Sequence, residues 1–221
     1  MCFLFHHSIR LFALGALFLT GCGRGAVVVV PEDPKFTALV EKVRNGEVDE
    51  ISPREFGGFN ELQIAQVFEL TRLRHLTLDQ SLLSNAGLAP IGKLVNLRFL
   101  SLSNTPVGDA GLVHLSSLAN LEVLKLDQLP ITDDGLVEVA KLKNLRQLSL
   151  WKTGISNVGM ARIKKMRLHS LSMDETRIGD EGLKELREMT SLKTLSVWRT
   201  DVTDVGVNAL KKAVPGLKVN K

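Results

Sequence analysis

Few side chains in this 221-residue sequence have the types and spacing that catalysis or metal binding requires. Cys2 and Cys22 are the two cysteines, and both stand in the first tenth of the chain, which excludes a disulfide framework and a multi-cysteine zinc site. No glycine-rich segment has the pattern of a phosphate-binding loop. His75 and His169 are too far apart in the expected repeat register to share a metal ion. We therefore predict a protein without a metal or cofactor, and not an enzyme.

One set of polar and aromatic residues recurs at a regular interval of 23 or 24 residues. It comprises Asp127, Trp151, Asp174 and Trp198. At roughly 5 Å per repeated strand, Asp127 and Asp174 would lie about 10 Å apart. That separation is slightly larger than the roughly 6.5–9.5 Å of the carboxylate pair in an inverting glycosidase, and neither residue is expected to lie in an apolar pocket. These residues are better suited to binding than to acid–base chemistry.

The same residues predict a recognition surface. Trp and Arg are enriched among the residues that dominate binding energy in protein interfaces. We expect Trp151, Asp174, Trp198 and Arg199 to form the centre of a protein- or glycan-binding patch, with Lys152 and Asp127 beside it. The alternative is that each tryptophan simply packs over the aliphatic stems of its neighbours.

These residues are positioned by an internal repeat with the pattern L-x-x-L-x-L. Its alternating leucines would face one side of a short strand, and the following L-x-x-L-x-x-L, as in Leu112, Leu115 and Leu118, has helical spacing. One unit cannot bury both leucine faces, so the units must stack. The units begin at Leu73, Leu97, Leu121, Leu145, Leu168 and Leu192, and a partial unit begins at Leu217.

This pattern resembles the leucine-rich repeat family. The resemblance implies an α/β fold, a right-handed solenoid arc with parallel strands on its concave face and helices on its convex face. Because the convex segments have helical spacing, the repeats are similar to the ribonuclease-inhibitor-like and F-box types rather than to the internalin type.

Three positions within the unit carry specific expectations. The ninth is mostly Ser or Thr, which predicts a buried hydroxyl ladder with a gap at Leu129. The thirteenth is always Asp or Asn, for example Asp133, and we expect these residues to be helix N-caps rather than metal ligands. The fifteenth is always Gly, for example Gly159, which predicts a close approach of adjacent coils.

Both ends of the repeat array need covers. Residues 35–72 are expected to form an N-terminal helical cap, with a helix that stops at Asn45-Gly46, a strand within 48–51, a helix start at 52–55 and a further helix over 62–70. Residues 73–221 would hold six repeats and a final partial strand, after Val214 to Gly216 break the last helix.

The N-terminus predicts export and lipid anchoring. An apolar run of about ten residues after Arg10 fits the core of a signal peptide and is too short to span a membrane. Leu19-Thr20-Gly21-Cys22 resembles the bacterial lipobox, which implies cleavage before Cys22 and lipidation of its thiol. Residues 1–21 would then be the signal peptide and 22–34 a lipidated tether. The alternatives are an uncleaved anchor and a wrongly assigned start codon.

Charge adds little about partners. The formal charge of +4 is too small for a dedicated nucleic-acid binder. Most basic residues of the predicted helices are spaced for a solvated face, although attraction to anionic lipid or an envelope polymer is an alternative. This group contains Lys141, Lys143, Lys164, Lys165, Arg167, Lys211 and Lys212.

We therefore predict a protein of the bacterial cell envelope, lipid-anchored to the outer membrane or the outer face of the inner membrane and periplasmic or surface-exposed. Its concave face would recognise a protein or a glycan without catalysis, and we expect no nucleic-acid partner and no small-molecule substrate. Two other functions stay open: a structural envelope protein, and a regulator or inhibitor of an envelope enzyme.

Overall fold

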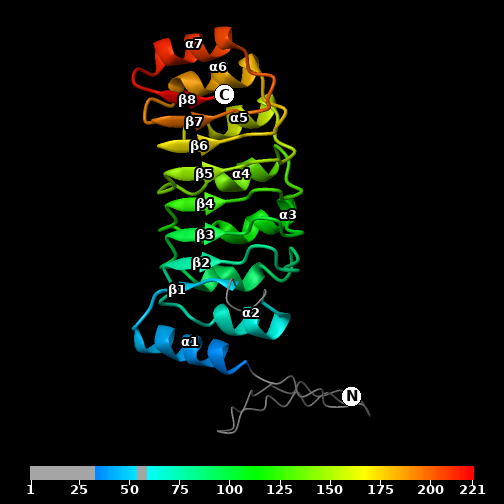
Figure 1. The fold of residues 1–221 in the computed structure, drawn as a ribbon, viewed down its shortest axis with the longest axis vertical. Helices are drawn as coiled ribbons and strands as arrows, with labels where there is room; N and C mark the ends of the chain where they lie inside the picture. Colours follow the sequence, from blue (N-terminus) through cyan, green and yellow to red (C-terminus); the bar gives the residue numbers. More distant parts are fainter. Residues whose placement is uncertain (1–32, 54–58) are drawn as a thin grey trace, which may run out of the picture.

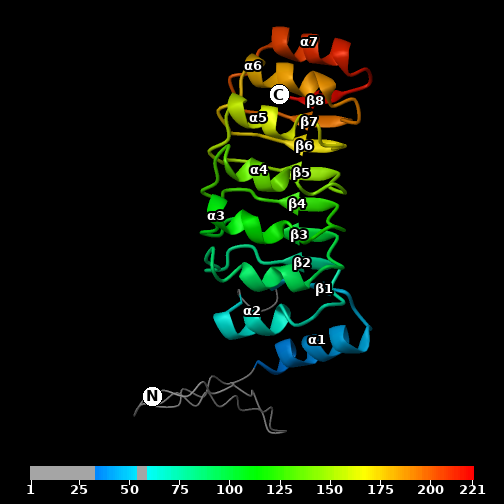
Figure 2. The same cartoon turned by 180° about the vertical axis from the view of Figure 1, so that it is seen from behind.

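The computed structural model describes residues 33–53 and 59–221. The predicted signal peptide, Cys22 and nearly all of the predicted tether lie outside these residues, as do Arg54 and Glu55 of the expected helix start. The described residues form an elongated stack in which one parallel sheet makes one layer and short helices make the other (Figure 1; Figure 2). This arrangement confirms the predicted leucine-rich-repeat solenoid.

The sheet has eight strands in chain order, and each strand pairs in parallel with the next. The central residue of each three-residue strand is apolar and pairs with its equivalent one repeat later, for example Leu100 with Leu124. The 23-residue spacing of the fourth unit leaves this register unchanged, since Leu148 still pairs with Leu171. The strands are β1 (Glu50–Ile51), β2 (His75–Thr77), β3 (Phe99–Ser101), β4 (Val123–Lys125), β5 (Gln147–Ser149), β6 (Ser170–Ser172), β7 (Thr194–Ser196) and β8 (Lys218–Asn220).

The helical layer consists of short elements, because each repeat leaves only two or three turns between successive strands. Its α-helices are α3 (Asp109–Leu112), α4 (Gly135–Val139), α5 (Asn157–Ile163), α6 (Asp180–Glu185) and α7 (Asp204–Ala213). Three 3₁₀ turns complete it: η2 (Ala89–Lys93), η3 (Val113–Leu115) and η4 (Leu186–Glu188). In the second repeat α3 runs directly into η3, so the expected helical face is present in a tighter form.

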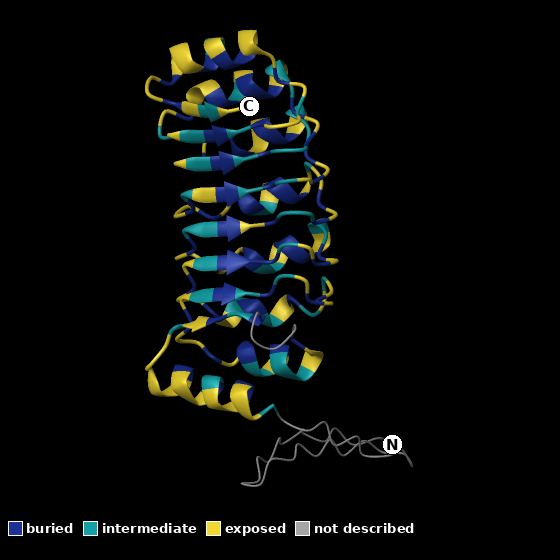
Figure 3. Ribbon diagram, viewed as in Figure 1, coloured by how far each residue is buried: buried dark blue, intermediate teal, exposed yellow. Residues whose placement is uncertain are grey.

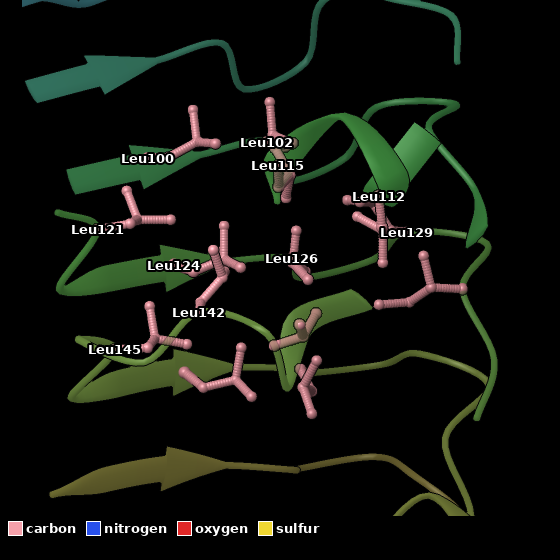
Figure 4. Close-up of a cluster of buried hydrophobic side chains, with 14 of the residues drawn as sticks. Leu100, Leu102, Leu112, Leu115, Leu121, Leu124, Leu126, Leu129, Leu142 and Leu145 are labelled. Carbon is pink, nitrogen blue, oxygen red and sulfur yellow. The ribbon is translucent and has the colours of Figure 1, made fainter. Parts of the chain in front are cut away.

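The core lies between the two layers and runs the length of the stack (Figure 3). Leu100 and Leu102 from the strand side and Leu112 and Leu115 from the helix side belong to one buried cluster, and all four are at most 1% exposed (Figure 4). The same set of buried leucines recurs in the neighbouring coils, so each repeat supplies part of the core of the next. Stacking is therefore what removes these side chains from water.

The predicted hydroxyl ladder is present. The side chains of Thr105 and Thr153 are buried, and each hydroxyl donates to the carbonyl oxygen three residues earlier, at 2.8 Å in both cases. Ser81, Thr176 and Thr200 make the equivalent bond. The ladder is interrupted at Leu129, which is buried but has no hydroxyl. These bonds give the carbonyl groups that follow each strand a donor from a side chain in the same turn.

The prediction that the thirteenth residue caps its own helix is wrong. Asp133 precedes α4, and its carboxylate accepts hydrogen bonds from the amide (2.8 Å) and the hydroxyl (2.6 Å) of Ser156 in the next coil. Asp180 binds Thr203 with the same two distances. Ser156 and Thr203 are themselves the N-caps of α5 and α7. The caps of α5 and α7 therefore stand one residue earlier than expected, the N-cap of α4 is Asp134, one residue later, and the side chains of Asp133 and Asp180 each join two coils.

The prediction that the repeated glycine marks a close approach of coils is confirmed, and the thirteenth residue is what approaches it. A Cβ atom at Gly111 would lie 2.7 Å from the side-chain oxygen of Asn85 in the preceding coil. Gly135, Gly159, Gly182 and Gly206 meet the Asp or Asn of their own preceding coils in the same way. Glycine is required here for space, since none of these five residues has a positive φ.

Separate elements cover the two ends of the stack. At the N-terminal end α1 (Pro34–Asn45) stops at Gly46, which has a φ of 77°, and α2 (Glu61–Val67) begins with a capping box between Asn60 and Gln63. The first helix ends where it was expected, α2 ends at Val67, three residues before the expected end, and β1 adds a strand to the sheet within the expected segment. At the other end Asp204 has no following coil, and its carboxylate pairs with Lys221 at 2.7 Å.

Within the described residues, no helix is long and apolar enough to cross a membrane.

Candidate binding surface

The face of the sheet that is turned away from the helices is the candidate site, and we call it the outer sheet face. Each repeat contributes three alternating positions to it, which in the sixth unit are Thr194, Ser196 and Trp198. The recurring set Asp127, Trp151, Asp174 and Trp198 occupies the third position, two residues after the end of each strand, and we call it the row. The intervening residues, Leu195 and Val197, are buried in the core. The period of two that the leucines indicated therefore places the row on an open surface.

The two aspartates of the predicted patch each hold the tryptophan of the next coil. One carboxylate oxygen of Asp127 accepts from the Trp151 amide at 3.0 Å and from the Ser149 hydroxyl at 2.5 Å. The corresponding oxygen of Asp174 accepts from the Trp198 amide at 2.6 Å. Sequence reasoning missed this role, because the spacing of the row does not reveal that one member binds the backbone of the next. These carboxylates position the tryptophans.

Trp198 and Arg199 are both exposed and lie against each other. Trp198 is 46% exposed, and the guanidinium carbon of Arg199 lies 4.0 Å from the centre of its ring. The guanidinium also lies 3.5 Å from the Glu175 carboxylate. Trp151 occupies the same position two coils earlier, with Asp174 between them, and is half-buried. The Arg199 guanidinium and the Trp198 ring together present a flat surface to which the ring contributes apolar area and the guanidinium a positive charge.

The residues after the row share an unusual backbone conformation. Lys152, Glu175 and Arg199 have φ values of 54°, 54° and 52°, in the left-handed region, although none is glycine. The conformation lets two of these amides continue the ladder between coils: Lys152 donates to the Asp174 carbonyl and Glu175 to the Trp198 carbonyl, both at 2.8 Å. Gln80, Asn104 and Gln128 repeat it in the earlier units. It also fixes the direction in which Lys152 and Arg199 leave the surface.

A second region of the outer sheet face was not predicted. A hollow of about 540 Å³ lies across β2, β3 and β4 and extends toward Leu39 of the N-terminal cap. Its outward side chains include Phe99, with the Lys125 ammonium 5.6 Å from the ring centre and the His75 ring 6.2 Å away. The period of two would have placed Phe99 and Lys125 on this face, but nothing in the sequence showed that α1 borders it.

The polar groups of the outer sheet face bond one another. The hydroxyls of Ser101 and Ser149 each lie 2.5 Å from an aspartate oxygen of the preceding coil, and Ser172 donates to Asp174 at 3.2 Å. These serines therefore face carboxylates, not histidines. No group of three or more potential metal ligands occurs in the part of the chain that the structure describes. The surface offers stacking, charge and hydrogen bonding to a partner.

Comparisons with known proteins agree with this architecture. Residues 93–116 and 165–186 match a family model described as Leucine Rich repeat. The fold is similar to that of internalin C2 from Listeria monocytogenes, with 25% identity and a TM-score of 0.55, over 70% of this chain and 64% of that one. A leucine-rich-repeat protein of Leptospira interrogans is 21% identical with a TM-score of 0.52, over 71% of this chain and 39% of that one. No curated protein matches the chain.

The chain therefore contains leucine-rich repeats and folds as a leucine-rich-repeat solenoid. It spans less than two-thirds of the length of either solved structure.

Proposed function

We propose that this protein recognises a protein partner through the outer sheet face, without catalysis. The observation that carries the proposal is the Arg199 guanidinium stacked on the 46%-exposed ring of Trp198. Trp and Arg supply much of the binding energy where they anchor an interface, because a large area is desolvated with little loss of side-chain entropy. Leucine-rich-repeat solenoids commonly use such extended surfaces for protein–protein interaction, which supports the proposal by analogy of fold.

The surrounding hydrogen bonds favour a site that is already formed before binding. Asp174 holds the Trp198 backbone, and the left-handed conformation of Arg199 fixes where its side chain begins. Binding of a partner would therefore cost little conformational entropy, because these side chains are already ordered. A glycan could stack on the same ring, and it is the alternative ligand.

The test is capture of a partner by the purified protein and by a Trp151→Ala/Trp198→Ala variant. The matched control is Val158→Ala/Val205→Ala, because both valines are exposed on the helical side, at 62% and 77%. We expect one stoichiometric protein partner that the tryptophan variant loses and the valine variant retains. Equal capture by the folded tryptophan variant would contradict the proposal. An enzyme as the partner would favour the regulator, and no partner would favour a structural role.

We further propose that the chain is a lipoprotein of the bacterial cell envelope. The proposal is supported by the resemblance of Leu19-Thr20-Gly21-Cys22 to the lipobox and by the short apolar run before it. Two or more acyl chains on Cys22 would give stable anchoring, which a single chain does not. Incorporation of labelled fatty acid should be lost in Cys22→Ala and kept in Cys2→Ala. Labelling that persisted in Cys22→Ala would contradict this assignment.

The domain limits and repeat type stay proposals as well. We propose that the exported chain consists of the tether 22–34, the cap 35–72 and the repeats 73–221. Helices of 5, 7 and 10 residues at α4, α5 and α7 support the ribonuclease-inhibitor-like or F-box repeat type.

A further inference from the structure

The fourth repeat, residues 145–167, has 23 residues where the first three and the fifth have 24, and the missing residue falls at the turn between its helix and the next strand. The earlier units enter the strand with a four-residue turn such as Leu142-Lys143-Asn144-Leu145. The fifth unit has only Met166-Arg167-Leu168 at this place. Since β5 and β6 stay in register, the shortening is absorbed at the edge of the stack where the strands begin.

The shortening also removes a bond that joins the coils at this edge. The side-chain amides of Asn96, Asn120 and Asn144 each donate to a carbonyl of the preceding coil, at 2.9, 2.9 and 2.8 Å. Arg167 stands where the next asparagine would be. Among the described residues, no side chain donates to the Lys143 carbonyl, which continues this series of acceptors.

A hollow of about 550 Å³ opens at this point between the third and fourth coils, and we call it the notch. Leu142 and Met166, both buried, form its apolar part. Its charged lining residues are all cations: Lys143, Arg146, Arg162, Lys165 and Arg167.

None of these five cations has a carboxylate within salt-bridge distance in the described part of the chain, although neighbouring cations do. Lys164 lies 3.0 Å from Glu185, and Lys141 lies 2.7 Å from Glu138. Glu122 stands one coil from Arg146, but it pairs with Arg98 at 3.0 Å. The notch therefore concentrates five positive charges that no nearby carboxylate neutralises, although the formal net charge of the whole chain is only +4.

Cations near the end of a helix often serve only to offset the helix dipole. This explanation fits Arg162 and Lys165, which lie in or just after the last turn of α5. It does not fit Arg146 and Arg167, which stand at the entries to β5 and β6. The Arg146 guanidinium also reaches toward the Arg167 carbonyl, at 3.4 Å, which brings the two residues together across the notch.

We propose that the notch binds an anionic ligand that carries two or more phosphate groups. A guanidinium group can donate two parallel hydrogen bonds to two oxygens of one phosphate. A lysine ammonium adds positive charge but cannot make this two-bond contact. Five cations exceed what one phosphate would neutralise, and the volume leaves room for the group that bears the phosphates. This site lies at the strand-entry edge and does not depend on the partner proposed for the outer sheet face.

The test uses the full-length protein with two probes: tripolyphosphate in solution, and phosphatidylcholine vesicles with and without phosphatidylinositol bisphosphate. The loss variant is Arg146→Gln/Arg167→Gln. The control variant is Lys211→Gln/Lys212→Gln, which removes the same charge from the exposed last turn of α7. We expect tripolyphosphate affinity to fall by at least about tenfold in the loss variant and to stay within about twofold in the control. Thermal unfolding of each variant shows whether it is folded.

The vesicle probe distinguishes the source of the phosphates. Vesicle binding that requires the bisphosphate lipid and is displaced by tripolyphosphate would assign the ligand to a lipid headgroup. Binding of tripolyphosphate alone would assign it to a soluble or polymeric phosphate. An Arg146→Lys/Arg167→Lys variant should recover part of the affinity, because charge returns without the paired donors. Equal losses in the loss and control variants, or no binding of either probe, would overturn the proposal.

Discussion

Replacing Gly159 with Ala should destabilise the solenoid, although the same change within most helices is stabilising. Gly159 lies in α5, and a Cβ atom there would overlap the Asp133 carboxylate and lie 2.9 Å from a methyl group of Leu136. The carboxylate would have to move by about 1 Å to restore van der Waals contact. That movement would stretch or break its bonds of 2.8 and 2.6 Å to Ser156.

The expected magnitude follows from two opposing effects. Hydrogen bonds to a charged group contribute about 1.5–3 kcal/mol each, and the two bonds share one carboxylate, so we take about 3 kcal/mol for their joint loss. Ala is favoured over Gly in a helix by about 1 kcal/mol. The free energy of unfolding should therefore fall by about 1–3 kcal/mol. Urea unfolding measures this change, provided that the dependence on urea concentration is unaltered.

A double-mutant cycle isolates the cause. Asp133→Ala removes the obstructing carboxylate, so Gly159→Ala added to it should cost far less than in the natural sequence and approach the stabilisation of an ordinary helix. The coupling between the two sites should exceed about 1 kcal/mol. Stabilisation by Gly159→Ala alone, or purely additive effects, would refute the idea that this glycine exists to admit the aspartate.

Three further predictions concern other repeated positions. Thr153→Val should lower the free energy of unfolding by about 1–3 kcal/mol in urea unfolding, because it leaves the buried Leu150 carbonyl without its donor; an unchanged value would contradict the ladder's role. Lys152→Gly should raise stability by up to about 1 kcal/mol, and Lys152→Val should lower it, because the backbone there is left-handed; the reverse order in thermal unfolding would contradict this reading. The hydrogen bonds from the Thr203 hydroxyl and amide lower the pKa of the Asp180 carboxyl. The ionised carboxylate therefore stabilises the folded state above about pH 4, the pKa range of an unfolded chain. This stabilisation is lost as the pH falls through the lowered pKa of the folded state. Asp180→Asn should therefore weaken the acid dependence of stability, and identical pH profiles for the two proteins would count against this assignment.

The leucine pattern was sufficient to predict the strands, the helical layer and the stacked architecture. Burial of leucine is non-directional, so a regular spacing in the chain becomes a regular spacing in space. The buried hydroxyls and the crowded glycines followed from the same regularity, since each position recurs in an identical environment. The gap at Leu129 was visible for the same reason.

The polar side chains were harder to interpret, because hydrogen bonding is directional and depends on which coil supplies the partner. Asp133 has the residue type of a helix cap, and only the offset between coils shows that it binds Ser156 of the next repeat. Asp127 and Asp174 were expected to contact a ligand, and the structure shows that they bind the backbones of Trp151 and Trp198. Whether they also contact a ligand stays a prediction.

The sequence by itself determined what repeats in this protein: the strand, the helical segment, the buried ladder and the row of outward residues. Only the tertiary structure decided what happens where neighbouring coils or caps meet. The stacking of Arg199 on Trp198 depends on a left-handed backbone that no periodic pattern encodes. The hollow beside Phe99 and the notch around Arg146 depend on distances between segments that are some 20 residues apart or more in the chain. The repeated sequence determines the order in which the coils stack. How far each coil is shifted relative to the next is determined by the packing of their side chains.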